Sequence, residues 1–183
     1  MTWSQSPPRT RSDPFDEIFN AHFAEIQGYV ARRLGVSAAE DVVAETFLTA
    51  FRKWDSFDPA RGSVRPWLYG IATNLIGKHR RSEVRALQAL GRRGPDPDPE
   101  SPEERVAARL SAEGLRPGLA KALAGLNQGE RDVLLLVALA GLSHEEIAAA
   151  LGVSYGTVGS RLSRARRKVK QSLGTNPMEE LDG

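Results

Sequence analysis

The segment HEEIAAALGVSYGTVGSRLSRARRKVK, residues 144–170, predicts two helices joined by a tight turn. Apolar residues recur every third or fourth position on both sides of Gly152, as a helix with one buried face requires. Glycine adopts a left-handed backbone without steric cost, so Gly152 suits the turn, and Ala148 is small where the two helices would cross. The wedge between them can be filled by Ile147, Leu151, Val153, Val158 and Leu162. The segment is a candidate helix-turn-helix; the alternative is an ordinary helical corner of a core.

The second of these helices is strongly cationic. Residues 155–173 contain six Lys or Arg and no acid, whereas residues 96–104 contain five acids and no base. The net charge of +2 is too small to indicate a partner, but a local cationic face favours a polyanion. A merely solvated face would usually mix both signs. In a major groove, outward Thr, Ser and Arg side chains reach base edges while later Arg and Lys meet phosphates. The outward positions here are Thr157, Ser160, Arg161, Arg164 and Lys168.

Composition excludes several classes of protein. The chain has 183 residues, 40% apolar, which fits one ordinary soluble domain or two small ones. It has no Cys, so a disulfide framework, a Cys-based zinc site and a thiol nucleophile are excluded, and its three His show no metal-ligand spacing. No apolar run approaches the ~20 residues of a membrane span, and the N-terminus lacks the apolar core of a signal peptide. We expect a cytoplasmic protein with no metal, no cofactor and no membrane insertion.

The rest of the chain predicts further helices and no strand. A helical apolar pattern runs from Phe15 to Leu34, after a polar segment rich in Pro and Ser. Ser37 and Glu40 form a predicted capping box that opens a second helix, reaching to about Trp54. The predicted buried face of this helix comprises Val43, Phe47, Ala50, Phe51 and Trp54. A third helix has Pro66 in its first turn and runs to Arg81 or beyond.

A tether separates two groups of helices. Residues 91–102, GRRGPDPDPESP, alternate Pro and Asp, which is typical of an extended linker. Helical segments resume near 103–113 and 115–125. The predicted fold is therefore all-α, with two small helical domains joined by a flexible Pro/Asp-rich linker. We place a disordered N-terminus at 1–14, the first domain at 15–90, the linker at 91–114, the second domain at 115–173 and a C-terminal tail at 174–183.

Aromatic and cationic residues alternate in FRKWDSFDPARGSVRPWLYGIATNLIGKHRRS, residues 51–82. Unpaired bases stack on aromatic rings while the strand backbone follows positive charge, and a loop between two helices can hold one flipped base. The alternative is that Trp54, Trp67 and Tyr69, which lie at helical spacing, belong to the core.

Three stretches together resemble one family. AAEDVVAETFLTAFRKWDSFD (38–58) and RPWLYGIATNLIGKHRR (65–81) are similar to region two of the bacterial sigma factors. GLSHEEIAAALGVSYGTVGSRLSRARRKV (141–169) resembles their region four. With only these two regions, the chain is similar to the extracytoplasmic-function (group four) sigma factors of the sigma-seventy family. The resemblance covers roughly residues 15–90 and 118–173.

The resemblance implies a specificity subunit of RNA polymerase without catalytic activity of its own. Region four would read the minus-thirty-five element as duplex, and region two would hold the melted minus-ten non-template strand to initiate transcription. The implied partners are promoter DNA, the clamp helices of the largest subunits of core RNA polymerase, the flap of the second-largest subunit, and an anti-sigma factor.

The resemblance also implies three sets of site residues. The first docks on core polymerase: Asp41, Glu45 and Leu48. The second binds the minus-ten strand, around a specificity loop at 56–65: Asp58, Arg61, Ser63, Arg65, Trp67, Asn74, Lys78 and Arg81. The third binds the minus-thirty-five element: Tyr155, Thr157, Ser160, Arg161, Arg164, Arg167 and Lys168.

Two glycines depart from the family pattern, and two other classes of protein stay open. Gly159 stands where the family usually has Lys or Arg, and Gly70 replaces a frequent Arg. A stand-alone helix-turn-helix regulator would need a ligand pocket or an acidic receiver site in residues 15–90, and no such Asp cluster is visible. A nucleic-acid enzyme would need clustered carboxylates; Asp55 and Asp58 are the candidates, although acids in such a loop usually make turns.

Overall fold

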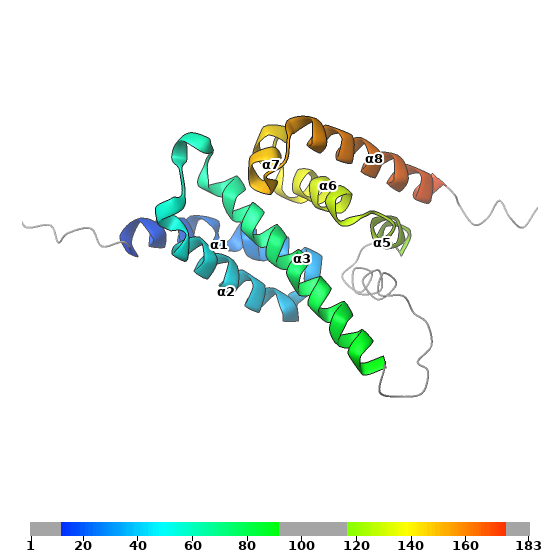
Figure 1. Cartoon of the computed structure of the whole chain (residues 1–183), viewed down its shortest axis with the longest axis horizontal. Helices are drawn as coiled ribbons and strands as arrows, with labels where there is room; N and C mark the ends of the chain where they lie inside the picture. The colour runs from blue at the N-terminus through cyan, green and yellow to red at the C-terminus, as the bar shows by residue number, and fades with distance from the viewer. Residues whose placement is uncertain (1–11, 92–116, 175–183) are drawn as a thin grey trace, which may run out of the picture.

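The structure is a computed structural model that describes residues 12–91 and 117–174. All regular elements in these two ranges are helical, as predicted (Figure 1). The first range contains α1 (Ser12–Leu34), α2 (Val36–Arg52), the short 3-10 helices η1 (Trp54–Ser56) and η2 (Pro59–Arg61), and α3 (Val64–Gly91). The second contains α5 (Pro117–Ala124), α6 (Gln128–Ala140), α7 (His144–Leu151) and α8 (Tyr155–Gly174). We call the helices of the first range the N-terminal bundle and those of the second range the C-terminal bundle.

Some predicted segments fall outside this description. They are residues 1–11, residues 92–114 of the linker, which include the helix predicted at 103–113, and the residues after 174. α1 begins at Ser12, inside the segment that was predicted to be disordered, and α5 corresponds to the helix predicted at 115–125.

The start of α2 corrects one prediction. The capping box at Ser37 and Glu40 is wrong, because α2 begins at Val36 and its N-cap is Gly35, which makes no side-chain cap. Gly35 has φ of 83°, a left-handed backbone that glycine adopts at no steric cost. It alone separates α1 from α2, so the chain reverses direction at this residue and Ser37 already lies in the first helical turn.

The buried face of α2 is partly as predicted. Val43, Phe47 and Ala50 are buried against α1 and α3. Phe51 is 37% exposed, and Trp54 lies beyond the end of α2 in η1, where it is half-buried. The fully buried stripe of α2 therefore ends at Ala50.

The predicted helix-turn-helix is present. Gly152 caps α7 in the left-handed conformation, with φ of 63°, and turns the chain into α8. Ile147 and Val158 are fully buried between the two helices, and Leu162 is 2% exposed. A capping box that the sequence analysis overlooked starts α7: the Ser143 hydroxyl accepts from the Glu146 backbone N–H, and the Glu146 carboxylate accepts from the Ser143 N–H.

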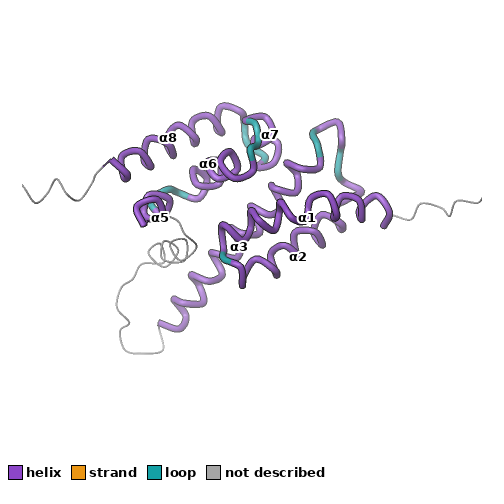
Figure 2. Tube along the Cα trace, turned by 180° about the vertical axis from the view of Figure 1, so that it is seen from behind, coloured by secondary structure: helices purple, strands orange, loops and turns teal. Residues whose placement is uncertain are grey.

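The two bundles pack directly against each other. α3 lies along α7 and also touches α6, which in turn contacts α1 (Figures 1 and 2). One continuous hydrophobic core includes Ile26 and Leu68 from the N-terminal bundle together with Leu136, Ile147 and Val158 from the C-terminal bundle. The sequence predicted two domains on a tether but gave no sign of this contact.

Candidate nucleic-acid interface

The loop between α2 and α3 is shaped by η1 and η2. Asp58 is the N-cap of η2, and its Oδ1 accepts a hydrogen bond of 2.9 Å from the Ala60 backbone N–H. Asp58 is thus a turn-forming residue, which is the usual role of an acid in such a loop. Ser63 is exposed just before α3, and Arg61 lies in η2. Within the two described ranges, no three His, Asp or Glu residues are grouped so that they could hold a metal ion.

Three aromatic rings gather at the base of this loop. Trp54 and Phe57 stack with ring centroids 5.3 Å apart, and Trp67 from the first turns of α3 lies 4.9 Å from Phe57. Trp54 and Trp67 pack against the core but stay half-buried. Tyr69 is 2% exposed, so its ring belongs to the core. The core interpretation is therefore confirmed for Tyr69, while base stacking on the half-buried rings stays a prediction.

The predicted strand-binding residues of α3 share one face of the helix. Asn74, Lys78 and Arg81 recur at steps of about one and two turns, and all three are exposed. Arg81 already has a partner: its Nη1 donates to Oε1 of Gln128, the first residue of α6, over 3.1 Å.

Arg65 is held by both bundles. Its Nε donates to Oε2 of Glu25 over 2.9 Å, and its Nη2 donates to the carbonyl oxygen of Ala140, at the end of α6, over 2.7 Å. Burial alone would raise the pKa of Glu25, but hydrogen bonds from His22 and Arg65 outweigh it and lower that pKa. Glu25 is therefore anionic at neutral pH and fixes the guanidinium of Arg65 at the bundle interface.

The first turn of α8 carries several predicted DNA-reading residues. Ser154 caps this helix, because its hydroxyl oxygen accepts a 3.1 Å hydrogen bond from the Thr157 backbone N–H. Its hydroxyl also lies 2.8 Å from the Thr157 hydroxyl, so Thr157 is partly engaged within the turn. Tyr155 is 56% exposed, and Ser160 is exposed. Arg161 lies over Gly129 of α6, and Arg167 is exposed farther along α8.

Glu130 of α6 holds two cations of α8. Lys168 Nζ donates to Glu130 Oε2 over 2.8 Å, and Arg164 Nε lies 3.5 Å from Glu130 Oε1. The same carboxylate closes a capping box with Asn127 at the start of α6. The Glu130 side chain is only 2% exposed, and the hydrogen bond from Lys168 is the main cause of its lowered pKa. Arg164 and Lys168, predicted to face DNA, thus also fasten α8 to α6.

Glu130 predicts an acid-sensitive C-terminal bundle. Its folded-state pKa is below the ordinary value of 4.5, so its stabilising contribution is present above pH 4.5 and is lost as the pH falls through the folded-state pKa. Urea unfolding at several values between about pH 3 and 6 should show this loss in the wild type and a flatter profile in Glu130→Gln. Glu17→Gln, at an exposed position of α1, is the control and should keep the wild-type profile.

Gly159 weakens α8 without a steric reason. A Cβ at this position would meet nothing within 4 Å, and the residue lies inside the helix Tyr155–Gly174. Gly159→Ala should therefore raise the free energy of unfolding by up to about 1 kcal/mol, measured by urea denaturation. Gly156→Ala is the matched control: its Cβ also meets nothing, but it lies in the first turn and should gain less. A loss of stability at Gly159→Ala would contradict this reading.

The predicted polymerase-docking residues lie on one exposed face of α2. Asp41 and Glu45 are exposed, and Leu48 is 42% exposed. They recur at steps of about one turn, so an acidic strip with an apolar end faces solvent.

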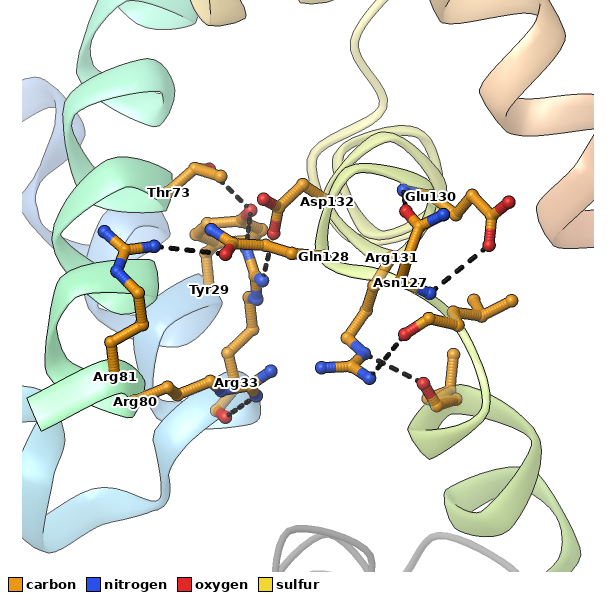
Figure 3. Close-up of polar contacts among 12 residues, drawn as sticks. Tyr29, Arg33, Thr73, Arg80, Arg81, Asn127, Gln128, Glu130, Arg131 and Asp132 are labelled. Atoms are coloured by element: carbon orange, nitrogen blue, oxygen red, sulfur yellow. Dashed lines mark hydrogen bonds and ion pairs between the residues drawn. The ribbon is translucent and has the colours of Figure 1, made fainter. Parts of the chain in front are cut away.

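A buried polar contact that was not predicted from the sequence joins the two bundles. Arg33 of α1 is 4% exposed; its Nη1 donates to the Tyr29 hydroxyl over 2.7 Å and its Nη2 donates to Asp132 of α6 (Figure 3). Burial, together with the guanidinium groups of Arg33 and Arg131, lowers the pKa of Arg80 to about 10. No local signal marks Arg33 or Asp132, because they are 99 positions apart.

The geometry is that of the helix-turn-helix class, with a second, aromatic and cationic surface on another bundle. Residues 18–86 match the family Sigma-70 region 2, and residues 118–169 match Sigma-70, region 4. The chain is 36% identical over 156 residues to RNA polymerase sigma factor CnrH of Cupriavidus metallidurans, covering 78% of each chain. It is 33% identical over 170 residues to ECF RNA polymerase sigma factor SigE of Mycolicibacterium smegmatis, covering 90% of this chain but only 63% of that relative.

Solved structures agree with these matches. CnrH in complex with the cytosolic domain of CnrY superposes with a TM-score of 0.62 at 29% identity, covering 90% of each chain. The sigma factor RpoE in complex with the anti-sigma factor NepR, from Bartonella quintana, superposes with a TM-score of 0.64 at 24% identity, covering 89% of this chain and 98% of that one. This second match shows the shared fold. The chain belongs to the sigma-70 family, among its ECF RNA polymerase sigma factors. The predicted family is confirmed. Within the two described ranges, every helix is too short or too polar to span a bilayer.

Proposed function

We propose that this chain is a promoter-specificity subunit of RNA polymerase. The C-terminal bundle would present α8 to the major groove of a minus-thirty-five duplex, and the N-terminal bundle would hold the melted minus-ten strand at loop 56–65 and along α3. One observation carries the proposal: one chain combines an exposed basic recognition helix with a separate surface of half-buried rings and exposed cations. A regulator that binds only duplex needs the first surface and has no use for the second.

The minus-ten surface suits a separated strand. Phe57 and Trp67 offer rings on which bases can stack, and Asn74 and Lys78 line the exposed face of α3 beside them. Capture of a flipped base and of the strand backbone offsets the few kcal/mol that opening base pairs costs. Because polymerase would hold both bundles on the same promoter, their separate affinities combine as an effective concentration.

The exposed strip Asp41, Glu45 and Leu48 is the proposed docking surface for the clamp helices of the largest polymerase subunits. The C-terminal bundle would meet the flap of the second-largest subunit. Polymerase performs the chemistry of RNA synthesis, and this chain needs no catalytic group of its own. Its proposed place is the cytoplasm, where core polymerase works. An anti-sigma factor is a further proposed partner, since the two solved structures named above are complexes with another protein, which for RpoE is an anti-sigma factor.

Run-off transcription tests the proposal. Purified chain added to core polymerase on fragmented genomic DNA should produce transcripts with discrete start sites, which core polymerase alone should not. Mapping these start sites then yields the promoter. Absence of any start site, together with tight and specific binding of the free chain to an operator duplex, would refute it and favour a stand-alone regulator.

A further inference from the structure

Five arginines line one cavity between the two bundles. The cavity has a volume of about 450 Å³ and lies between α3 and α6, beside the end of α1. Its arginines are Arg33, Arg80, Arg81, Arg85 and Arg131. Within the described ranges, the lining has one carboxylate, that of Asp132, against these five guanidinium groups, which gives a net charge of +4. A concave site lined by one sign of charge attracts ions of the other sign.

Two arginines of α3 keep hydrogen-bond donors for a ligand. A guanidinium group has five N–H donors on its three nitrogens. Within the described ranges, Arg80 uses only Nη2, which donates to the carbonyl oxygen of Arg33 over 2.6 Å. Arg85 uses only Nε, which donates to the carbonyl oxygen of Arg81 over 3.2 Å. The remaining N–H groups of both side chains suit the oxygens of a phosphate group, which guanidinium groups bind through paired hydrogen bonds.

A buried donor in the same lining has no partner. The Arg33 side chain is 2% exposed, and its Nη1 and Nη2 donate to Tyr29 and Asp132. Its Nε has no hydrogen-bond partner in the described ranges. Buried polar groups are nearly always paired, because an unpaired one costs free energy. Since Arg33 lines the cavity, an acceptor bound there would satisfy this donor.

The arginines also repel one another. Burial, together with the guanidinium groups of Arg33 and Arg131, lowers the pKa of Arg80 to about 10, so Arg80 is still charged at neutral pH. Figure 3 shows Arg80 extending from α3 and Arg131 from α6. Arg131 Nε and Nη2 donate to carbonyl oxygens at the end of α5, including that of Leu123, so Arg131 adds its charge to the cavity. An anion bound among these side chains would offset the repulsion.

We propose that this cavity binds a small anion that carries a chain of two or three phosphate groups, as inorganic polyphosphates and nucleoside triphosphates do. A single phosphate group carries a charge of only about −2 at neutral pH, which is less than the lining can neutralise. The volume lies within the range of about 300–1,000 Å³ that is usual for small-molecule sites. The proposal goes beyond the promoter function above and does not depend on it.

Isothermal titration calorimetry of the full chain tests the site, in a buffer without phosphate or divalent cations. The probes are inorganic tripolyphosphate, adenosine triphosphate and adenosine. Both triphosphates should bind, and adenosine should not. Equal affinities for the two triphosphates would identify the phosphate chain as the whole ligand, and tighter binding of adenosine triphosphate would identify a nucleotide. Either result supports the proposal.

Variants locate the binding. Arg80→Gln and Arg85→Gln should each weaken triphosphate binding about tenfold, because each removes charge-assisted hydrogen bonds to the anion. Arg32→Gln in α1 and Arg166→Gln in α8 change the net charge equally at exposed positions outside the cavity, and should bind like the wild type. Circular dichroism checks that each variant is folded. Arg85 is exposed, so its variant keeps the test valid if Arg80→Gln does not fold.

Three results would overturn the proposal. The first is no binding of either triphosphate at millimolar concentration; if Arg85→Gln then weakens binding of a single-stranded oligonucleotide, the cavity belongs to the strand site. The second is an equal loss of triphosphate binding in Arg166→Gln and Arg85→Gln, which would indicate general attraction of counterions. The third is binding that appears only after the five acids of residues 96–104 are changed to Asn and Gln, because the chain's own carboxylates would then be the ligand.

Discussion

Asp132→Ala is expected to part the two bundles while leaving each of them folded. The change leaves the Arg33 guanidinium, whose side chain is 2% exposed, without its anionic partner. An uncompensated buried charge costs about 3–5 kcal/mol, and Arg33 can regain water only if α6 moves away from α1. Small-angle scattering should show a larger radius of gyration than the wild type, with the helical circular dichroism signal retained.

A double variant provides the control. Arg33→Met with Asp132→Leu removes both charges, and apolar replacement of a buried pair is often neutral or stabilising. Tyr29 keeps a partner, because its hydroxyl lies 2.9 Å from the Thr73 hydroxyl. The double variant should therefore return to the wild-type radius. If Asp132→Ala alone stays as compact as the wild type, the pair does not hold the interface.

Asp41→Lys combined with Glu45→Lys is expected to abolish stable binding to core polymerase. Both carboxylates are exposed on α2, so the change should leave the fold intact while it reverses the charge of the proposed docking strip. A polymerase surface that is complementary to two carboxylates is cationic, so the two new lysines would face like charges. Such a juxtaposition costs several kcal/mol, which corresponds to a loss in affinity of at least about a hundredfold. Co-purification of tagged chain with core polymerase measures the loss.

Asp16→Lys with Glu17→Lys is the matched control for this change. It alters the net charge equally, at exposed positions of α1 outside the docking strip. Recovery of polymerase should stay near that of the wild type. Equal recovery with both double variants would place the docking surface elsewhere on the chain.

Much of the fold could be predicted because its signals are local. The left-handed glycine at 152, the apolar stripe of α8 and the start of α3 near Pro66 follow from periodicity and backbone preference. The prediction failed where a neighbouring element decided the outcome. Ser37 lost its expected role because Gly35 alone turns the chain from α1 into α2, which already begins at Val36. Phe51 lies within α2 but at the edge of the core, where it contacts Phe15 and stays 37% exposed.

The site residues show the same limit. The family resemblance assigned Asn74 and Lys78 to the strand site and Tyr155 to the duplex site, and all three side chains are exposed in the structure. It could not show that Glu130 holds Lys168, because these residues are 38 positions apart on separate helices. A cationic residue in a sequence pattern looks equally available whether or not a distant carboxylate holds it.

By itself, the sequence determined which segments are helical, where the recognition helix starts and which family the chain resembles, since these depend on residues within a few turns of each other. The tertiary structure decided that Arg33 is buried with Asp132, that Arg65 is held by both bundles, and that Gly70 lies against the backbone of α7. Such contacts arise only when helices far apart in the chain are packed, because their energies depend on distances that no local pattern specifies.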